Sequence, residues 1–130
     1  MRNTLNPPDI EEFLVGHLNA TVASVPWATQ VPRERDDTSV VGVVRRLGGV
    51  RGPWVTDEPM VTVEVWAPDR SDAYQGCVDA CTELQRLVGE VTDGVTVYRV
   101  AETSGPTNLP DPDSAMPRYT ATLIVRVRGT

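Results

Sequence analysis

The sequence contains no lysine, and all twelve of its basic residues are arginine. Codon bias in a GC-rich genome explains this pattern most simply, although arginine also suits protein interfaces because its planar guanidinium group pairs with carboxylates through two hydrogen bonds. Eighteen acidic residues outnumber the arginines, which leaves a net charge of −6 and a pI of about 4.7. This acidic balance argues against a nucleic-acid binder that relies on a basic patch.

Residues that bind metals or act as nucleophiles are scarce. Cys77 and Cys81 are the only cysteines and His17 is the only histidine, so we expect no zinc site. The cysteines are four residues apart on one helix face, which disfavours a mutual disulfide and predicts two small core residues. His17 borders an apolar stripe beside Phe13 and Leu14, and this position favours a helix-flank or capping role over catalysis.

Motifs for catalysis and cofactor binding are also missing. No glycine spacing matches a phosphate-binding pattern, and no GxSxG nucleophile motif is present. The adjacent carboxylates Glu11–Glu12, Asp36–Asp37 and Asp57–Glu58 would point apart on a helix or strand, so we expect them on solvated surface. The segment DPDS at 111–114 lacks the glycine and closing glutamate of an EF-hand loop, which predicts a turn. We therefore expect a protein that is not an enzyme and has no metal or cofactor.

No apolar run approaches the length of a membrane span. Polar residues and prolines follow Met1, where a signal peptide would have an apolar run, so we expect a soluble protein that folds in a reducing cytoplasm. A chain of 130 residues suits one domain, spanning residues 1–130, in which helices pack on a sheet.

The clearest pattern of secondary structure spans residues 60–91. Valines alternate with polar residues over 60–66, which predicts a strand with Trp66 on its polar face. Pro68 ends this strand, and Asp69 or Ser71 caps the helix that follows. The apolar stripe of that helix is Ala73, Cys77, Ala80, Cys81, Leu84, Leu87 and Val88.

The remaining elements pack against this unit. An earlier helix is predicted to start at Asn6-Pro7-Pro8-Asp9 and to end before Pro26. Strands are expected at 27–31 (short, at an edge), 40–47, 95–101 and 118–128, with Gly42 marking a bulge or a close approach. The fold class is therefore α/β of the α+β type: a mixed, mainly antiparallel sheet of four to five strands with two main helices packed on it.

Two long loops, 48–59 and 102–117, are the expected places for function. Arginine and tryptophan of the first loop and its flank form a cation–aromatic cluster, and such residues are favoured as interface anchors. An exposed loop without a partner is the alternative. The predicted partner-binding residues are Arg45, Arg46, Arg51, Trp54, Trp66, Asp111, Asp113 and Arg118.

Three blocks in this order carry a family resemblance: VVRRLGG at 43–49, residues 61–73, and PDPDSAMPRYTATLIVRVRG at 110–129. Together with the leading helix, they resemble the tail terminator (tail completion) proteins of long-tailed bacteriophages, especially those that infect actinobacteria. The resemblance covers nearly the whole chain. It implies a small α/β subunit that assembles into a six-fold ring, caps the tail tube, stops its polymerisation and presents a surface to the head connector.

The resemblance also implies partners and a location. The partners are further copies of the chain, the tail tube protein and the head–tail connector protein, and the ring assembles in the host cytoplasm and ends in the virion. If acidic residues line the ring lumen, genomic DNA would pass without sticking, because like charges repel. The alternatives are another neck protein, such as a connector or adaptor, or a small α+β ligand-binding module or enzyme that uses His17 or a carboxylate pair.

Overall fold

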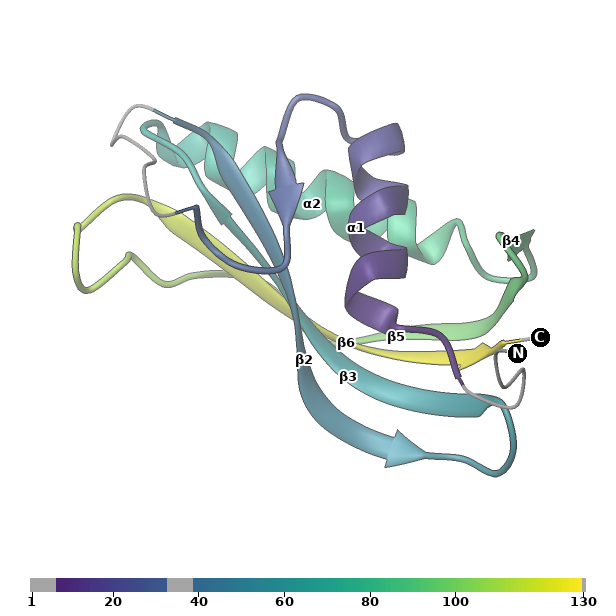
Figure 1. Ribbon diagram of the computed structural model, residues 1–130. Helices are drawn as coiled ribbons and strands as arrows, with labels where there is room; N and C mark the ends of the chain where they lie inside the picture. The colour runs from purple at the N-terminus through teal and green to yellow at the C-terminus, as the bar shows by residue number, and fades with distance from the viewer. Residues whose placement is uncertain (1–6, 33–38, 130) are drawn as a thin grey trace.

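The computed structural model describes residues 7–32 and 39–129, which form two helices and a curled six-stranded sheet with the order β1-β2-β3-β6-β5-β4 (Figure 1). The strand β1 pairs with β2 in parallel, and the other neighbouring strands pair antiparallel. The elements are α1 (Ile10–Thr21), β1 (Trp27–Ala28), β2 (Val41–Arg51), β3 (Thr56–Trp66), α2 (Arg70–Gln85), β4 (Val91–Thr92), β5 (Val95–Asn108) and β6 (Arg118–Arg128).

The predicted α+β class with two helices is confirmed, but the description of the sheet is corrected. The sheet is mixed, as expected, but the described residues form six strands in place of the four to five that we expected. The short edge strand that we expected at 27–31 is confirmed as β1, although it has only two residues. We did not expect β4, whose two residues are too few to show an alternating pattern. The parallel pairing of β1 depends on a contact with distant residues, which local patterns do not reveal.

Both helices begin at an aspartate that accepts a backbone hydrogen bond. Asp9 caps α1 by accepting from the Glu12 N–H (3.3 Å), so this helix begins later than predicted, and Asn6 lies outside the described residues. Asp69, one of the two caps that we predicted, caps α2 by accepting from the Ser71 N–H (2.7 Å). These bonds satisfy amides at the helix start that have no partner within the helix.

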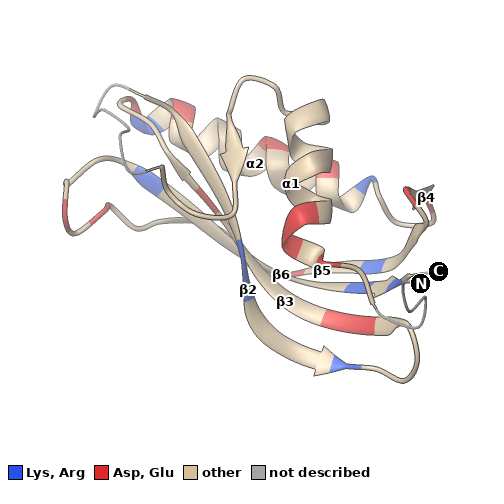
Figure 2. Ribbon diagram, in the orientation of Figure 1, with Lys and Arg blue, Asp and Glu red and all other residues tan. Residues whose placement is uncertain are grey.

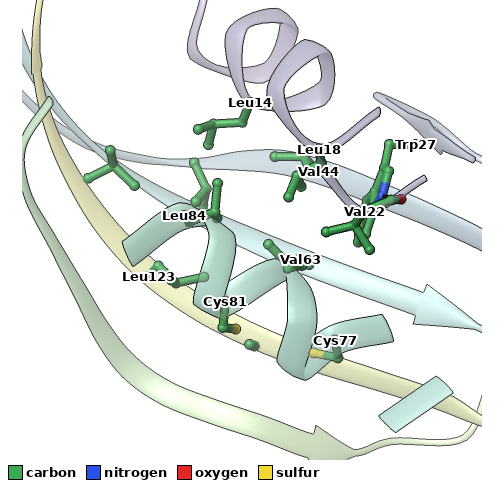
Figure 3. Close-up of a cluster of buried hydrophobic side chains, with 14 of the residues drawn as sticks. Leu14, Leu18, Val22, Trp27, Val44, Val63, Cys77, Cys81, Leu84 and Leu123 are labelled. Carbon is green, nitrogen blue, oxygen red and sulfur yellow. Dashed lines mark hydrogen bonds between the residues drawn. The ribbon is translucent and has the colours of Figure 1, made fainter. Parts of the chain in front are cut away.

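The core lies between the helices and one face of the sheet (Figure 3). Alternate residues of β3 and β6 are buried beneath the helices, and Cys77 and Cys81 of α2 are buried there as predicted. The ring of Trp27 packs on Gly42, where an added Cβ atom would lie 2.4 Å from the ring. The predicted close approach at Gly42 is therefore confirmed, because only glycine leaves room for the indole.

The two loops that we predicted are mostly strand. β2 and β3 continue through much of 48–59 and leave only 52–55 as the turn of a hairpin. Gly48 and Gly49, where we expected the first loop to begin, instead form an irregularity within β2, with φ values of 97° and 104°. β5 likewise extends to Asn108. Strand β5 tolerates Pro106, which has no N–H to donate, because this residue lies in the register shift between Ser104 and Thr107, beyond the part of β5 that pairs with β4.

Candidate functional site

The predicted partner-binding residues of the two loops lie at opposite ends of the sheet. At one end, which we call the hairpin end, Thr56 of β3 and Thr96 of β5 both pair with Arg128 of β6. At the other, which we call the loop end, Trp66 pairs with Arg118, and residues 109–117 connect β5 to β6. The ten residue steps from 118 to 128 correspond to about 34 Å of strand. The predicted residues therefore form two separate surfaces.

Asp111 organises the connection 109–117. Its carboxylate accepts hydrogen bonds from the backbone N–H of Asp113 (2.9 Å), the hydroxyl of Ser114 (3.1 Å) and the indole N–H of Trp66 (3.1 Å). The bond from the Asp113 N–H is the largest of the effects that lower the pKa of Asp111, and Ser114, Trp66 and the charge of Arg118 add to it. Asp111 therefore stabilises the turn through hydrogen bonds within the connection, and the predicted turn at 111–114 is confirmed.

Trp66 lies on the face of β3 opposite the core valines, as predicted, but it is buried, so the expectation that it is available to a partner is wrong. Only 3% of its surface is exposed, and it packs with Val41, Val43 and Met116 in a small cluster on the helix-free side of the sheet. The guanidinium carbon of Arg118 lies 5.6 Å from the centre of the Trp66 ring, within range of a cation–π contact. The Nε of Arg118 also donates to the carbonyl of residue 109 at 2.8 Å. Both side chains hold the connection in place.

The outer side of this connection faces solvent. Leu109 is 48% exposed, and Pro110, Pro112 and Asp113 are exposed as well. Ala115 adopts a φ of 58°, a left-handed conformation that is uncommon for alanine. The loop end thus presents an apolar, proline-containing segment with an acidic side chain, fixed from behind by Asp111.

Arg46 forms a structural ion pair with Asp57. Its guanidinium donates to both carboxylate oxygens of Asp57, at 2.9 Å for the Nη2–Oδ1 bond, and its Nε donates to the Gly48 carbonyl. Asp57 is only 2% exposed, so the expectation of a solvated Asp57–Glu58 pair is wrong. The hydrogen bonds to Asp57 raise the pKa of Arg46. Glu11 also accepts from the Arg46 backbone N–H (2.8 Å) and so ties α1 to β2.

Arg45, in contrast, points to the helix-free side of the sheet. Its side chain is 46% exposed and lies 3.8 Å from the carboxylate of Glu64, which is a loose contact. Arg51 is exposed at the end of β2 and Asp113 at the loop end, where each is accessible to a partner.

The hairpin end contains a hollow of about 470 Å³, which we call the hairpin-end hollow. The turn is held by a hydrogen bond from the Thr56 N–H to the Pro53 carbonyl (3.1 Å), and the Gly129 N–H donates to the Val55 carbonyl (2.9 Å). The lining residues are Trp54, Val55, Thr56, Tyr98, Arg126 and Arg128.

Trp54 is the most exposed large apolar residue of this hollow. Its side chain is 75% exposed, and its backbone has a φ of 59°. Tyr98, Arg126 and Arg128 were not among the predicted site residues. The alternation of β6 does place both arginines on one face, but Tyr98 lies at a register shift between residues 97 and 99, where alternation along β5 is lost.

Other candidates for chemistry have structural roles. The Nε2 of His17 lies 3.1 Å from the carbonyl of Glu83, so the histidine links α1 to α2 on the flank of the helix. Among residues 7–32 and 39–129, no three His, Cys, Asp or Glu side chains gather as metal ligands would. The Asp36–Asp37 pair lies outside the described residues.

Neither described helix has the length and apolar composition needed to cross a membrane. A comparison of the chain with known protein-family models finds no match, and a search of curated proteins finds no significant similarity.

Proposed function

We propose that this chain is a structural virion protein: a tail terminator subunit that assembles into a six-fold ring on the tail tube. The ring ends tube polymerisation and joins the tail to the head connector, and genomic DNA passes through its lumen without specific binding. The family resemblance of the sequence motivates this proposal. The structural observation that carries it is a set of apolar side chains exposed on one hairpin.

Three large apolar side chains of the β2–β3 hairpin face solvent. Leu47 is 54% exposed, Val50 is 70% exposed and Trp54 is 75% exposed. Apolar surface of this kind is typical of protein interfaces, and tryptophan is among the residues that contribute most binding energy there. The adjacent Arg51 adds a second residue type that is enriched in interfaces. The hairpin is thus suited to contact a neighbouring subunit.

The edges of the sheet support an assembling subunit as well. Within the part of the chain that the structure describes, no strand pairs with β2 after Val43 on its outer side, or with β5 after Thr96. Long edges of this kind usually need protection, because their free N–H and C=O groups can pair with another chain. Contacts between copies of the chain would supply that protection.

The test is the mass and shape of the purified protein. Light scattering after size-exclusion chromatography, with negative-stain images, should show a ring of about six times the 14.2-kDa mass of one chain. Assembly should strengthen with protein concentration or when the tail tube protein is added. A monomer at every concentration, both alone and with the tube protein, contradicts the proposal.

A matched pair of variants separates the hairpin from general surface effects. Leu47→Ser should prevent ring formation without loss of folding, since the side chain is largely exposed. Val91→Ser is the control, because Val91 is 67% exposed on β4, at the other edge of the sheet from β2. Equal effects of the two changes would show that the hairpin has no special role.

A further inference from the structure

We propose that the hairpin-end hollow binds segment 109–113 of a second copy of this chain, so that neighbouring copies join head to tail. This inference rests on the proposed ring and names the contact that builds it. The two surfaces differ in chemistry and match each other.

The hollow combines aromatic and cationic groups. Trp54 and Tyr98 are 75% and 48% exposed, and Arg126 and Arg128 lie beside them on β6. Figure 2 shows arginine segments of β5 and β6 near this end of the sheet. Its volume of about 470 Å³ is enough for a few side chains. Trp54 has a φ of 59°, an unfavourable conformation that is found more often at binding sites than elsewhere. Arg126 also lies 4.0 Å from the carboxylate of Glu58, a loose contact between exposed side chains that neutralises its charge only in part. The hollow is therefore suited to an apolar ligand with a negative charge.

Segment 109–113 has the complementary features. Leu109 and the prolines are exposed, and Asp113 supplies an exposed acidic side chain. Figure 2 shows the acidic segments of this connection at the end of the molecule opposite to the arginine segments at the hairpin end of β5 and β6. Proline-rich segments dock on aromatic grooves at low cost in entropy, because their backbone is already restricted. The hydrogen bonds of Asp111 restrict it further and leave Leu109 and Asp113 facing outward.

The two surfaces cannot meet within one molecule. They lie at opposite ends of β6, which spans about 34 Å from residue 118 to residue 128. A contact between two different surfaces of identical chains is heterologous, and such contacts close into rings when the rotation between copies allows. The match between the ends thus favours a cyclic assembly over a symmetric dimer.

A charge-exchange experiment tests the contact directly. The variant Arg126→Glu/Arg128→Glu has two acidic surfaces and should not assemble. The variant Asp113→Arg has two basic surfaces and should also remain monomeric. An equimolar mixture should recover rings in which the two variants alternate, because each hollow then meets a segment of opposite charge. The readout is light scattering with negative-stain images. Variants that each assemble like the unmodified chain, or a mixture that does not recover, would overturn the proposal.

A disulfide test gives an independent readout. Tyr98→Cys and Asp113→Cys, mixed under oxidising conditions, should form a covalent dimer that neither forms alone. Val91→Cys mixed with Asp113→Cys is the control and should not cross-link. The native thiols do not interfere, because both are buried. The pKa of Cys77 is also raised, mainly by a hydrogen bond with Cys81 and secondly by burial, which keeps this thiol unreactive.

The outcomes separate this contact from the proposed function. If the unmodified chain forms rings but the charge exchange and the cross-link both fail, the contact is wrong and the ring stands. If the unmodified chain never assembles, both proposals fall. Binding of a short single-stranded DNA that is lost in Arg126→Glu/Arg128→Glu and unchanged in Asp113→Arg would assign the hollow to nucleic acid and overturn the inference.

Discussion

Adjacent arginines of β2 have different roles because they face opposite sides of the sheet. Arg46 holds the buried carboxylate of Asp57, whereas Arg45 makes one loose contact with Glu64. Arg46→Ala should lower the free energy of unfolding by about 1.5–3 kcal/mol, since Asp57 would lose charged hydrogen bonds in a buried position. Arg45→Ala should cost less than about 1 kcal/mol, as is usual for an exposed pair. Urea unfolding of both variants measures the difference.

One outcome of the unfolding experiment would contradict the prediction for Arg46. Equal losses for the two variants would show that the hydrogen bonds between Arg46 and Asp57 do not stabilise the fold. Arg46→Lys is a useful third variant, because it keeps the charge but lacks the planar group that contacts both carboxylate oxygens. Its stability should lie between those of Arg46→Ala and the unmodified chain.

At the scale of elements, the β2–β3 hairpin depends on one of its two adjacent glycines more than the other. Both have positive φ, so alanine at either position should cost about 1–2 kcal/mol in backbone strain. An added Cβ at Gly49 would lie 2.4 Å from the Glu58 carbonyl oxygen, whereas one at Gly48 has no atom within 4 Å. Gly49→Ala should therefore cost roughly 1–3 kcal/mol more than Gly48→Ala in urea unfolding. Equal costs would contradict the close packing of Gly49 on β3.

The connection 109–117 should loosen in acid. The pKa of Asp111 is lowered from its ordinary value of 3.8, so its stabilising effect is complete above about pH 3.8 and is lost as the pH falls through the lower, folded value. The indole N–H of Trp66 donates a hydrogen bond to Asp111, so its signal in nuclear magnetic resonance reports the protonation of the Asp111 carboxylate. The signal should stay constant from pH 6 to pH 4 and shift below pH 3.8. The exposed indole of Trp54 is the internal control, and a Trp66 midpoint above pH 3.8 would contradict the prediction.

Local patterns revealed the elements that are long enough to show a period. Both helices and the strands β2, β3, β5 and β6 follow from alternation, apolar stripes and caps. The short edge strand β1 was predicted within 27–31, but its parallel pairing was not, and β4 was missed because two residues show no period. The bounds of β2 and β5 were drawn too short because glycine and proline inside them resemble turn signals. The same limit affected the site. Alternation shows which face carries Trp66 but not that a later connection folds over it, and a register shift hides Tyr98.

At the scale of the whole molecule, two electrostatic effects act on assembly in opposite directions. Each copy has a net charge of −6, so copies repel one another, and salt weakens that repulsion. The proposed contact between Asp113 and the arginines of β6 is attractive, and salt weakens it too. The salt dependence of assembly by the unmodified chain should therefore mix both effects, and only a comparison with variants separates them.

Asp113→Asn isolates the ionic part of the contact, because it removes one carboxylate and changes the net charge little. We expect it to weaken assembly by about 2- to 5-fold at 0.05 M salt, the range of an exposed ion pair, and the difference should nearly vanish at 0.5 M. Trp54→Ala removes apolar contact area instead, so it should weaken assembly by roughly 10-fold or more at both salt concentrations. Light scattering over a dilution series measures both. If the effect of Asp113→Asn stays the same at high salt, Asp113 does not pair with arginine in the ring.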